Sequence, residues 1–363
     1  MPVIRPLTAV RAGVLLLGLA LCLPAPVTAQ SSSRSTKSTS TKSTKSVKAK
    51  KPAYSASASR ARKARLARAR AAARVREQAR RQRQLRALQE AMTPRYKTDA
   101  TGSLVPDVRA AAAIIFDPET GQVLWEENGS DKRSIASITK VMTAVVFLED
   151  NPDLSQQVTI ERGDVYAAST TYLRANERVT LENVLHLALI ASDNAAARAL
   201  ARLSHGGTAA FIERMNEKAL ELGLESTSFA DPSGLNPNNV SSAYDLSRLI
   251  TYAAHDERIA AVMQKTRYAV KTSRRTITIN NTNHLLRGSD ANTMEVMGGK
   301  TGFINKAGYC LATLLRLPQT NHQVAVVVLG ASSNNGRFWE TRHLFNWLSD
   351  KAADLFGKDQ QKD

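Results

Sequence analysis

The sequence predicts a mixed α/β fold of the α+β kind, in which helices flank one antiparallel sheet and a buried central helix runs beside it. Three observations predict it: a hairpin pattern early in the globular part, helical patterns in the middle, and several apolar strands near the end. Because the order is strands, helices, strands and a last helix, the first hairpin can pair with the later strands and close one sheet.

Each element has its own pattern. Arg109–Phe116 is an apolar strand, Asp117–Gly121 a tight turn and Gln122–Glu126 a returning strand. Ile138–Leu148 is apolar on almost every face, which is typical of a helix in the centre of a domain. We expect further helices within Leu181–Arg202 and Thr208–Leu222, strands at Thr266–Lys271, Met294–Lys300, Tyr309–Leu317 and Gln323–Leu329, and a last amphipathic helix at Arg337–Phe356.

The charge of the 363-residue chain is very unevenly distributed. Its formal net charge is +18, but residues 1–93 hold 21 Lys and Arg against two acidic residues. Residues 94–363 hold 29 basic and 30 acidic residues and are therefore nearly neutral. The high isoelectric point belongs to the N-terminal part, so it does not indicate nucleic-acid binding by the globular part.

Residues 1–29 have the pattern of a secretory signal peptide. Arg5 and Arg11 precede or flank the start of an apolar run, Ala12–Leu23, which is too short to span a bilayer comfortably. Small residues around Ala29 favour cleavage there, and an uncleaved N-terminal anchor is the alternative. We expect export to the periplasm, and a mature chain with one cysteine and no internal disulfide.

Residues 30–93 form a basic tail in two parts. Residues 30–59 are mostly Ser, Thr, Lys and Ala, a composition typical of disorder. Residues 60–92 are rich in Ala, Arg and Gln, which favour a helix, but no continuous apolar stripe drives that helix onto a core. The tail either associates with an anionic membrane surface or wall polymer, or acts as a spacer, and residues 94–363 form the globular domain.

Ser137-Ile138-Thr139-Lys140 is the first candidate catalytic motif. Residues three apart share a helix face, so the Lys140 amine comes within reach of the Ser137 hydroxyl. A serine hydroxyl needs a neighbouring base, and burial in an apolar helix favours the neutral lysine that can act as one. Ser-x-x-Lys occurs once in the chain, although the tail is full of Ser and Lys.

Two further motifs provide candidate cleft residues. Ser192-Asp193-Asn194 interrupts two apolar helical stretches, where Ser192 can relay a proton and Asn194 can hold a substrate carbonyl; an ordinary helix cap is the alternative. Lys300-Thr301-Gly302 reads as an edge strand, with Lys300 and Thr301 binding a substrate carboxylate and Gly302 letting a ligand approach closely. The backbone N–H groups of Phe303 and Ser137 are candidate oxyanion donors, and Lys300 is a cation that can hold Lys140 neutral.

The order and spacing of these motifs are more specific than any one of them. Ser-x-Asn begins 52 residues after Lys140, and Lys-Thr-Gly begins 106 residues after Asn194. This is the pattern of penicillin-binding proteins and class A β-lactamases.

The chain resembles D-alanyl-D-alanine carboxypeptidases and endopeptidases, the low-molecular-mass penicillin-binding proteins, and looks most similar to their type-7 endopeptidase branch. The resemblance runs from about Val108 to about Leu348, through SIASITKVMTA (134–144), DPSGLNPNNVSSAYDL (231–246), NTNHL (281–285) and GGKTGFINKAGYCLA (298–312). It implies a β-lactamase/transpeptidase-like fold and cleavage of D-Ala-containing stem peptides and cross-links of peptidoglycan.

The resemblance also implies roles for single residues. Ser137 would form the acyl-enzyme, Lys140 would accept its proton, Ser192 would be a catalytic hydroxyl and Lys300 would bind substrate, with Asn194, Thr301 and Gly302 as cleft residues. β-Lactams would be covalent inhibitors, and no metal or cofactor is implied. The larger carboxypeptidases of this family carry a second β-rich domain and a C-terminal membrane-binding helix, whereas only 61 residues follow Gly302 here. We expect the last helix to pack on its own sheet, with a membrane anchor as the alternative, and the absence of the second domain favours the endopeptidase branch.

Two alternatives stay open. A β-lactamase uses the same three motifs, but it needs a carboxylate in a loop after Ser-x-Asn to hydrolyse its acyl-enzyme. Asp231 is the only acidic residue in the segment 226–244. A catalytically idle wall-binding protein would keep the fold and act through its basic tail.

The remaining reactive residue types predict no further chemistry. The six histidines have no metal-ligand spacing, His186 is expected in the core, and His284 has a structural role or lines the cleft. Cys310 alternates into an apolar strand and is expected to be a small buried hydrophobe.

Overall fold

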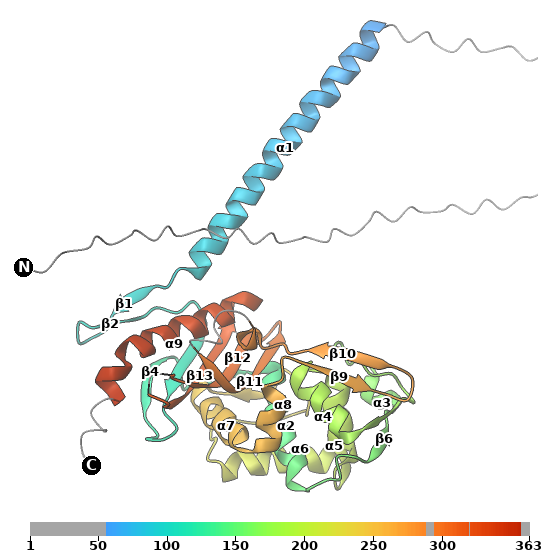
Figure 1. Cartoon of the computed structure of the whole chain (residues 1–363), viewed down its shortest axis with the longest axis vertical. Coiled ribbons are helices and arrows are strands. Elements are labelled where there is room, and N and C mark those ends of the chain that lie inside the picture. Colours follow the sequence, from blue (N-terminus) through green and yellow to red (C-terminus); the bar gives the residue numbers. More distant parts are fainter. Residues whose placement is uncertain (1–55, 288–293, 319, 357–363) are drawn as a thin grey trace, which may run out of the picture. The chain divides into compact units, whose positions relative to one another are not determined.

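The computed structural model describes residues 56–287, 294–318 and 320–356 (Figure 1). The predicted signal peptide and the first part of the tail lie outside the described residues. Contacts divide the chain between Arg70 and Ala71, and the helix α1 (Ala56–Met92) contains this division. The described side chains of α1 are almost all exposed, both before and after this division, in agreement with the prediction of a solvated helix.

A five-stranded antiparallel sheet organises the second unit. The strand order is β11 (Glu295–Ile304), β12 (Gly308–Arg316), β13 (Gln323–Ala331), β3 (Ala112–Phe116) and β4 (Val123–Glu127). Leu329 pairs with Ala112 and Val327 with Ile114, so the first hairpin joins the last strands as the sequence predicts. The order leaves β11, which carries Lys-Thr-Gly, at one edge of the sheet (Figure 1).

The two faces of the sheet build two separate parts of the core. Along β13 the side chains of Val324, Val326 and Val328 pack with Phe338, Phe345 and Leu348 of α9 (Asn334–Phe356). The alternate residues Ala325, Val327 and Leu329 belong to the other cluster, which contains the helices of the opposite face. This is the two-residue alternation of a strand covered on both faces. The last helix therefore packs on its own sheet, while the side chains of Leu355 and Phe356 lie outside the described ones.

The helical part surrounds α2 (Thr139–Glu149). Every residue of α2 from Thr139 to Leu148 is buried, including Lys140, so the prediction of a buried central helix is confirmed. The helices α4 (Leu181–Ile190), α5 (Asn194–Leu203) and α6 (Gly207–Glu221) pack around it. The break between α4 and α5 falls on Ser192-Asp193, where the sequence motif interrupts the apolar pattern.

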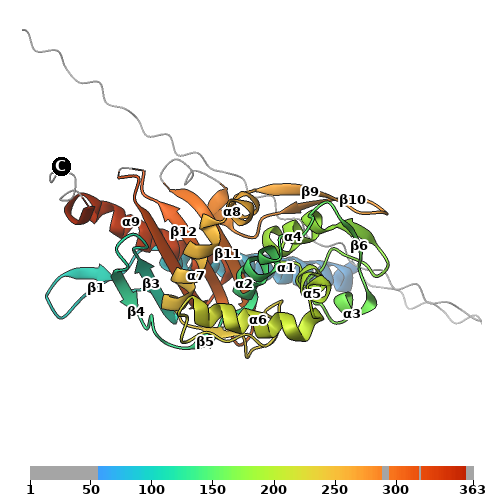
Figure 2. The ribbon, with the colours of Figure 1, turned by 90° about the horizontal axis from the view of Figure 1, so that it is seen from below.

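Helix α7 (Ala243–His255), which was not predicted from the sequence, packs on β12 and β13 (Figure 2). A local signal was present, because Ser242 caps this helix by accepting a hydrogen bond from the Asp245 N–H at 3.0 Å. The other short elements are α3 (Arg162–Val165), α8 (Glu257–Met263), η1 (Ala136–Ile138), η2 (His284–Leu286) and the ribbons β1–β2 (Tyr96–Thr98, Leu104–Pro106), β5–β8 (Arg133–Ser134, Val240–Ser241), β6–β7 (Gln157–Thr159, Arg178–Thr180) and β9–β10 (Arg267–Lys271, Thr276–Asn280).

No helix among the described residues is both long enough and apolar enough to cross a membrane.

Candidate active site

Ser137 lies in the single turn η1, immediately before α2. The preceding residue, Ala136, has a left-handed backbone with φ of 49°, which is strained for a residue with a side chain. Two glycines hold this turn. A Cβ added to Gly234 would lie 2.1 Å from the Ala136 carbonyl oxygen, and one added to Gly302 would lie 2.7 Å from that of Ile135.

This packing changes the interpretation of Gly302. From the sequence, the missing side chain was expected to let a ligand approach the strand. Gly302 does line the cleft, but the space of its absent Cβ is taken by the backbone beside Ser137. The glycine is therefore required for strand β11 to touch the turn that carries the serine.

Lys140 lies one helical turn below Ser137 and is completely buried. Its Nζ is 3.0 Å from Ser137 Oγ, 2.6 Å from Asn194 Oδ1 and 2.5 Å from the carbonyl oxygen of Ser233. Burial lowers the pKa of Lys140 to about 7, against the opposing effect of the carboxylates of Asp231 and Asp193. The neutral amine is therefore available near neutral pH.

The three partners fix the direction of the amine. An ammonium group has three N–H donors, and these three contacts use all of them. When Lys140 is neutral, two N–H groups remain for Asn194 and Ser233, and the lone pair faces the Ser137 hydroxyl. This is the arrangement that a general base requires.

The Ser192-Asp193-Asn194 motif combines a helix cap with two cleft residues. Asp193 caps α5 by accepting from the Ala196 N–H at 2.9 Å, while Ser192, at φ of 58°, and Asn194 both line the cleft. The second Asp193 oxygen accepts from the Tyr172 N–H at 2.5 Å. Burial raises the pKa of this carboxyl, although the hydrogen bonds that it accepts favour its ionised form.

Lys300 is the second fully buried lysine. Its Nζ donates to Ser192 Oγ at 2.8 Å and to the Thr301 carbonyl oxygen at 2.9 Å. Burial lowers its pKa well below the usual value, and the charges of Lys140 and Arg337 lower it further. We expected the charge of Lys300 to lower the pKa of Lys140, whereas here the charge of Lys140 lowers the pKa of Lys300. Burial is the main cause of the lowered pKa of both lysines.

Strand β11 also presents its backbone to the cleft. Since Lys300 Nζ contacts both Ser192 and the Thr301 carbonyl, the backbone polar groups of Thr301 face the Ser192 side. Residues two apart in a strand point their backbone groups the same way, so the Phe303 N–H is expected to face that side too. The Phe303 ring is 46% exposed and stacks on Tyr309, with ring centroids 4.2 Å apart.

A cleft of about 430 Å³ lies between these elements. Six of the eight predicted site residues line it, while Lys140 and Lys300 lie buried beneath Ser137 and Ser192. The lining residues that were predicted are Ser137, Ser192, Asn194, Thr301, Gly302 and Phe303, and those that were not are Ser169, Thr170, Ala191, Leu235, Thr282, Ile304, Asn305 and Arg337.

Arg337 is the most informative of the missed residues. It comes from α9, and its guanidinium donates to the carbonyl oxygens of Gly302 at 2.9 Å and Cys310 at 3.2 Å. Burial lowers its pKa to about 10, so it stays charged at neutral pH. No sequence motif connects Arg337 to Gly302, because only the return of α9 across the sheet brings the two together.

The comparisons with known proteins agree with this geometry. The family model of D-alanyl-D-alanine carboxypeptidases, peptidase family S11, matches residues 99–333.

The chain belongs to the D-alanyl-D-alanine carboxypeptidase family.

Within this family, the chain is similar to curated proteins of both specificities. It is 34% identical to a D-alanyl-D-alanine endopeptidase of Escherichia coli over 254 residues, 69% of this chain and 80% of that protein. A D-alanyl-D-alanine carboxypeptidase of Bacillus subtilis is 32% identical and matches 63% of this chain and 59% of that protein. The solved Streptomyces K15 DD-transpeptidase superposes with a TM-score of 0.62 at 30% identity, covering 67% of this chain and 97% of the other. The predicted serine-peptidase class and transpeptidase-like fold are thereby confirmed.

The histidines and Cys310 lie outside the catalytic constellation of this family member. His186 stacks on Tyr268 with ring centroids 3.9 Å apart, and burial lowers its pKa. His284 stacks on Phe338 and is not among the residues that line the cleft. Of a structural role and a place in the cleft wall, it therefore has the structural role. Cys310 is buried, as predicted, and burial raises the pKa of its thiol to about 11. Within the described part of the chain, no group of His, Cys, Asp and Glu has the arrangement of a metal site.

Proposed function

We propose that this protein is a penicillin-sensitive D-Ala-D-Ala endopeptidase and carboxypeptidase that cleaves peptidoglycan peptides through an acyl-enzyme on Ser137. One observation carries the proposal: the buried amine of Lys140, with its pKa near 7, lies 3.0 Å from Ser137 Oγ. A neutral amine at this distance makes the serine nucleophilic without a metal or cofactor.

Acylation begins when Ser137 Oγ attacks the carbonyl carbon of a D-Ala residue and Lys140 Nζ accepts the hydroxyl proton. The new C–O bond turns the carbonyl oxygen into an oxyanion. The backbone N–H groups of Ser137 and Phe303 are the donors proposed to stabilise it, across the contact between η1 and the edge strand β11.

The leaving amine then needs a proton. Ser192 Oγ accepts a hydrogen bond from Lys300, so its own O–H remains available to donate toward the cleft. We propose that this hydroxyl relays the proton from Lys140 to the leaving nitrogen, with Asn194 holding both Lys140 and a substrate carbonyl. Water then hydrolyses the ester and regenerates Ser137.

We propose that the end of the cleft formed by Thr301 and Thr282 orients the substrate. Thr301 presents its hydroxyl beside Thr282, at 2.7 Å, and Arg337 adds buried positive charge behind the strand. We assign to the Lys300 amine a hydrogen bond to the substrate. A terminal carboxylate is attracted to such a site by charge and by hydrogen bonds.

The β-lactamase alternative receives no support from Asp231. Its Oδ1 accepts hydrogen bonds from the backbone N–H groups of Gly234 and Asn236 and from Asn239 Nδ2, and its Oδ2 accepts from both the backbone and the hydroxyl of Ser233. With both oxygens occupied, this carboxylate shapes the loop that supplies the Ser233 carbonyl to Lys140. We therefore propose slow release of bound penicillin, and rapid turnover of nitrocefin would contradict it.

The idle-fold alternative predicts that Ser137→Ala leaves wall turnover in cells unchanged. The close contacts of both lysines argue against it, since fully buried lysines reduce stability and serve no purpose in a fold that only binds.

The matched relatives include proteins of both activities, and the endopeptidases are matched over the larger share of their lengths. Endopeptidases of Escherichia coli and Pseudomonas aeruginosa are matched over 80% and 79% of their lengths, whereas carboxypeptidases of Bacillus subtilis and Escherichia coli are matched over 59% and 63%. The test is digestion of mixed muropeptides, pentapeptide monomers and D-Ala-linked dimers, read by mass spectrometry. Conversion of dimers to monomers supports endopeptidase activity, loss of alanine from monomers alone supports carboxypeptidase activity, and no change in either refutes the proposal.

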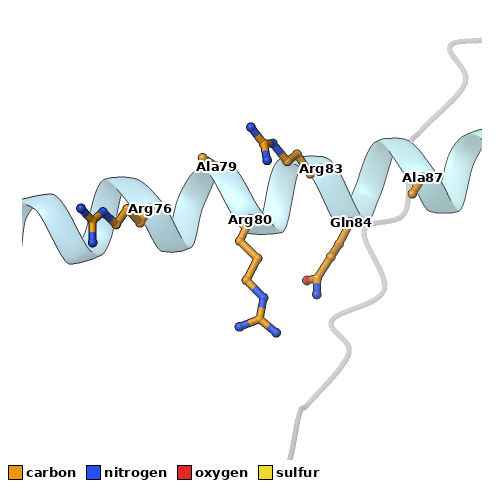
Figure 3. Close-up of a pocket in the computed structure, with 6 residues that line it drawn as sticks. All are labelled: Arg76, Ala79, Arg80, Arg83, Gln84 and Ala87. Atoms are coloured by element: carbon orange, nitrogen blue, oxygen red, sulfur yellow. The ribbon is translucent and has the colours of Figure 1, made fainter.

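We further propose export to the periplasm through the signal peptide at residues 1–29, and weak association of the basic tail with an anionic membrane surface or wall polymer. Side chains of α1 support an electrostatic role only. Arg76, Arg80 and Arg83 recur at helical spacing along one face of α1 (Figure 3), whereas Arg74 and Arg81 fall on the opposite face. The positive charge therefore surrounds the helix rather than facing an apolar stripe. Such binding is expected to weaken strongly as salt increases.

A further inference from the structure

A cluster of basic side chains lies at the tip of the β9–β10 hairpin and the adjoining part of β7. We call it the hairpin basic patch, and it consists of Arg174, Arg178, Lys271, Arg274 and Arg275. Figures 1 and 2 both draw the hairpin in orange, reaching toward the end of the unit that holds β6. The sequence analysis gave these residues no role.

Backbone contacts bring the two halves of the patch together. The Ser273 N–H donates to the Arg178 carbonyl at 2.8 Å, the Arg178 N–H donates to Ser273 Oγ at 3.0 Å, and Val179 forms a bridge with Thr272. Residues that are 95 positions apart in the chain thus share one surface.

The positive charge of the patch is mostly uncompensated. Arg275 lies 3.7 Å from the fully buried carboxylate of Glu177, and these two charges offset each other. In the described part of the chain, the other four basic side chains have no carboxylate at ion-pairing distance, and all four residues are exposed. Four such charges stand out because residues 94–363 have a formal net charge of −1.

The patch adjoins the catalytic cleft on two sides. Arg275 Nη2 donates to the Tyr172 carbonyl at 2.7 Å, and Tyr172 follows two residues after Thr170, which lines the cleft. On the other side, β10 leads from the patch to Thr282, another lining residue. At about 3.3 Å per extended residue, Arg275 lies within about 10 Å of the cleft wall, and the uncompensated Arg174, four residues after Thr170, lies within about 13 Å of it.

We propose that the hairpin basic patch binds carboxylates of the second stem peptide in a cross-linked substrate. This inference rests on the proposed function and deepens it. A leaving D-Ala carries one carboxylate, which the Thr301 end of the cleft can take, whereas the leaving stem of a cross-link carries several and extends further. A stem of three or four residues spans the distance to the patch. The patch therefore favours cross-linked dimers over pentapeptide monomers.

The test compares two full-length variants that each lose three positive charges. R174Q/R178Q/R274Q removes the three arginines of the patch that have no carboxylate at ion-pairing distance. The control K132Q/R316Q/K351Q removes basic residues of the β4–β5 loop, β12 and α9. Michaelis constants are measured for purified D-Ala-linked dimers and for pentapeptide monomers, together with the rate of acylation by labelled benzylpenicillin.

We expect the patch variant to raise KM for dimers about tenfold, because exposed charges each contribute modestly, and to reduce the salt dependence of dimer cleavage. KM for monomers, the penicillin acylation rate and all values for the control are expected to stay at wild-type levels. An unchanged KM for dimers would overturn the inference, as would an equal loss with monomers and penicillin.

Two further outcomes distinguish substrate binding by the patch from lipid binding, and failure of this inference from failure of the proposed function. If the patch variant loses binding to phosphatidylglycerol vesicles while its KM for dimers stays unchanged, the patch serves a lipid surface and the inference is wrong. If the wild-type enzyme is acylated by penicillin but cleaves neither muropeptide, the proposed function itself fails, and the inference fails with it.

Discussion

Two buried lysines lie beneath one cleft, although lysine is among the residues that proteins bury least. Each amine is surrounded by oxygen atoms rather than by a carboxylate partner: Ser137, Asn194 and Ser233 contact Lys140, and Ser192 and Thr301 contact Lys300. Neutral acceptors satisfy the N–H groups without restoring the charged form that an ion pair would favour. At Lys140, this arrangement keeps the amine available as a base.

The titration of Lys140 predicts how acylation depends on pH. Because burial lowers its pKa to about 7, the amine is protonated and inactive below that value and neutral above it. The rate of acylation by benzylpenicillin should therefore rise through about pH 7 and level off at higher pH. Stopped-flow or gel-based labelling measures it. A midpoint near the ordinary value of 10.5 would contradict the assignment of Lys140 as the base.

Ser137→Ala should abolish the covalent adduct. Removing a nucleophile typically costs catalysis by a factor of about 10⁴ or more, while the loss of one oxygen from a single turn should leave the fold intact. Intact-protein mass spectrometry after penicillin treatment detects the adduct, and the thermal midpoint reports folding. Ser333→Ala, at the start of α9, is the matched control and should be labelled like the wild type.

At the scale of elements, the site is a contact between the turn η1 and the edge strand β11. This contact has no room for a side chain at Gly302, since its Cβ would lie 2.7 Å from one carbonyl and 3.1 Å from the Ser137 nitrogen. The proposed oxyanion donors lie on opposite sides of this contact. Small changes in the distance between η1 and β11 should therefore affect catalysis more than stability.

Gly302→Ala tests this sensitivity. We expect acylation to slow by about a hundredfold, since misplacement by a fraction of an ångström to one ångström is costly, and stability to fall by about 1–3 kcal/mol. Gly163→Ala is the control, because an added Cβ there meets nothing within 4 Å. Acylation of G302A at the wild-type rate would show that the contact is not tight.

Asp193 connects two elements to the cleft, and Asp193→Ala tests that connection. The variant removes the cap of α5 and the tether on the Tyr172 N–H. Loss of the cap should cost about 1 kcal/mol, and acylation should slow as well, because Ser192 and Asn194 flank the released position. The control Asp256→Ala removes the equivalent cap from α8 and should lower stability without changing acylation. Equal acylation in the two variants would argue against a positioning role.

The long apolar elements could be predicted from the sequence, whereas α7 and the short ribbons could not. Strands such as β13 have a run of apolar residues that only a doubly covered strand requires. Helix α7 lies behind the irregular segment 231–242, and its first residues read as a continuation of that loop. The three motifs give most of the site for a physical reason: each motif is a local segment whose spacing has chemical meaning. Ser233, whose carbonyl contacts Lys140, and the cleft residues Thr282 and Arg337 lack such a local spacing, because tertiary packing brings them to the site.

At the scale of the whole molecule, charge and catalysis occupy different parts of the chain. The formal net charge is +19 in residues 1–93 and −1 in residues 94–363. The family match begins at residue 99, so the basic tail lies outside it. We therefore expect the tail to influence where the enzyme acts rather than how it reacts.

Removal of residues 1–93 should keep the penicillin acylation rate within about twofold and abolish binding to anionic vesicles at low salt, since that binding is electrostatic. Sedimentation with phosphatidylglycerol vesicles measures the second effect, and neutral phosphatidylcholine vesicles are the control. Retained binding to anionic vesicles by residues 94–363 would assign the interaction to the globular domain instead.

Cys310 gives this enzyme a natural reporter for motion in the wall of its active site. It is completely buried on β12, directly opposite Gly302 of β11 in the strand register, and its raised pKa keeps the thiol unreactive while the sheet is closed. If the signal peptide is removed, Cys22 leaves with it and Cys310 is the one remaining thiol. The rate at which a reagent such as iodoacetamide modifies the native protein then measures how often the edge of the sheet separates, and bound penicillin should slow it.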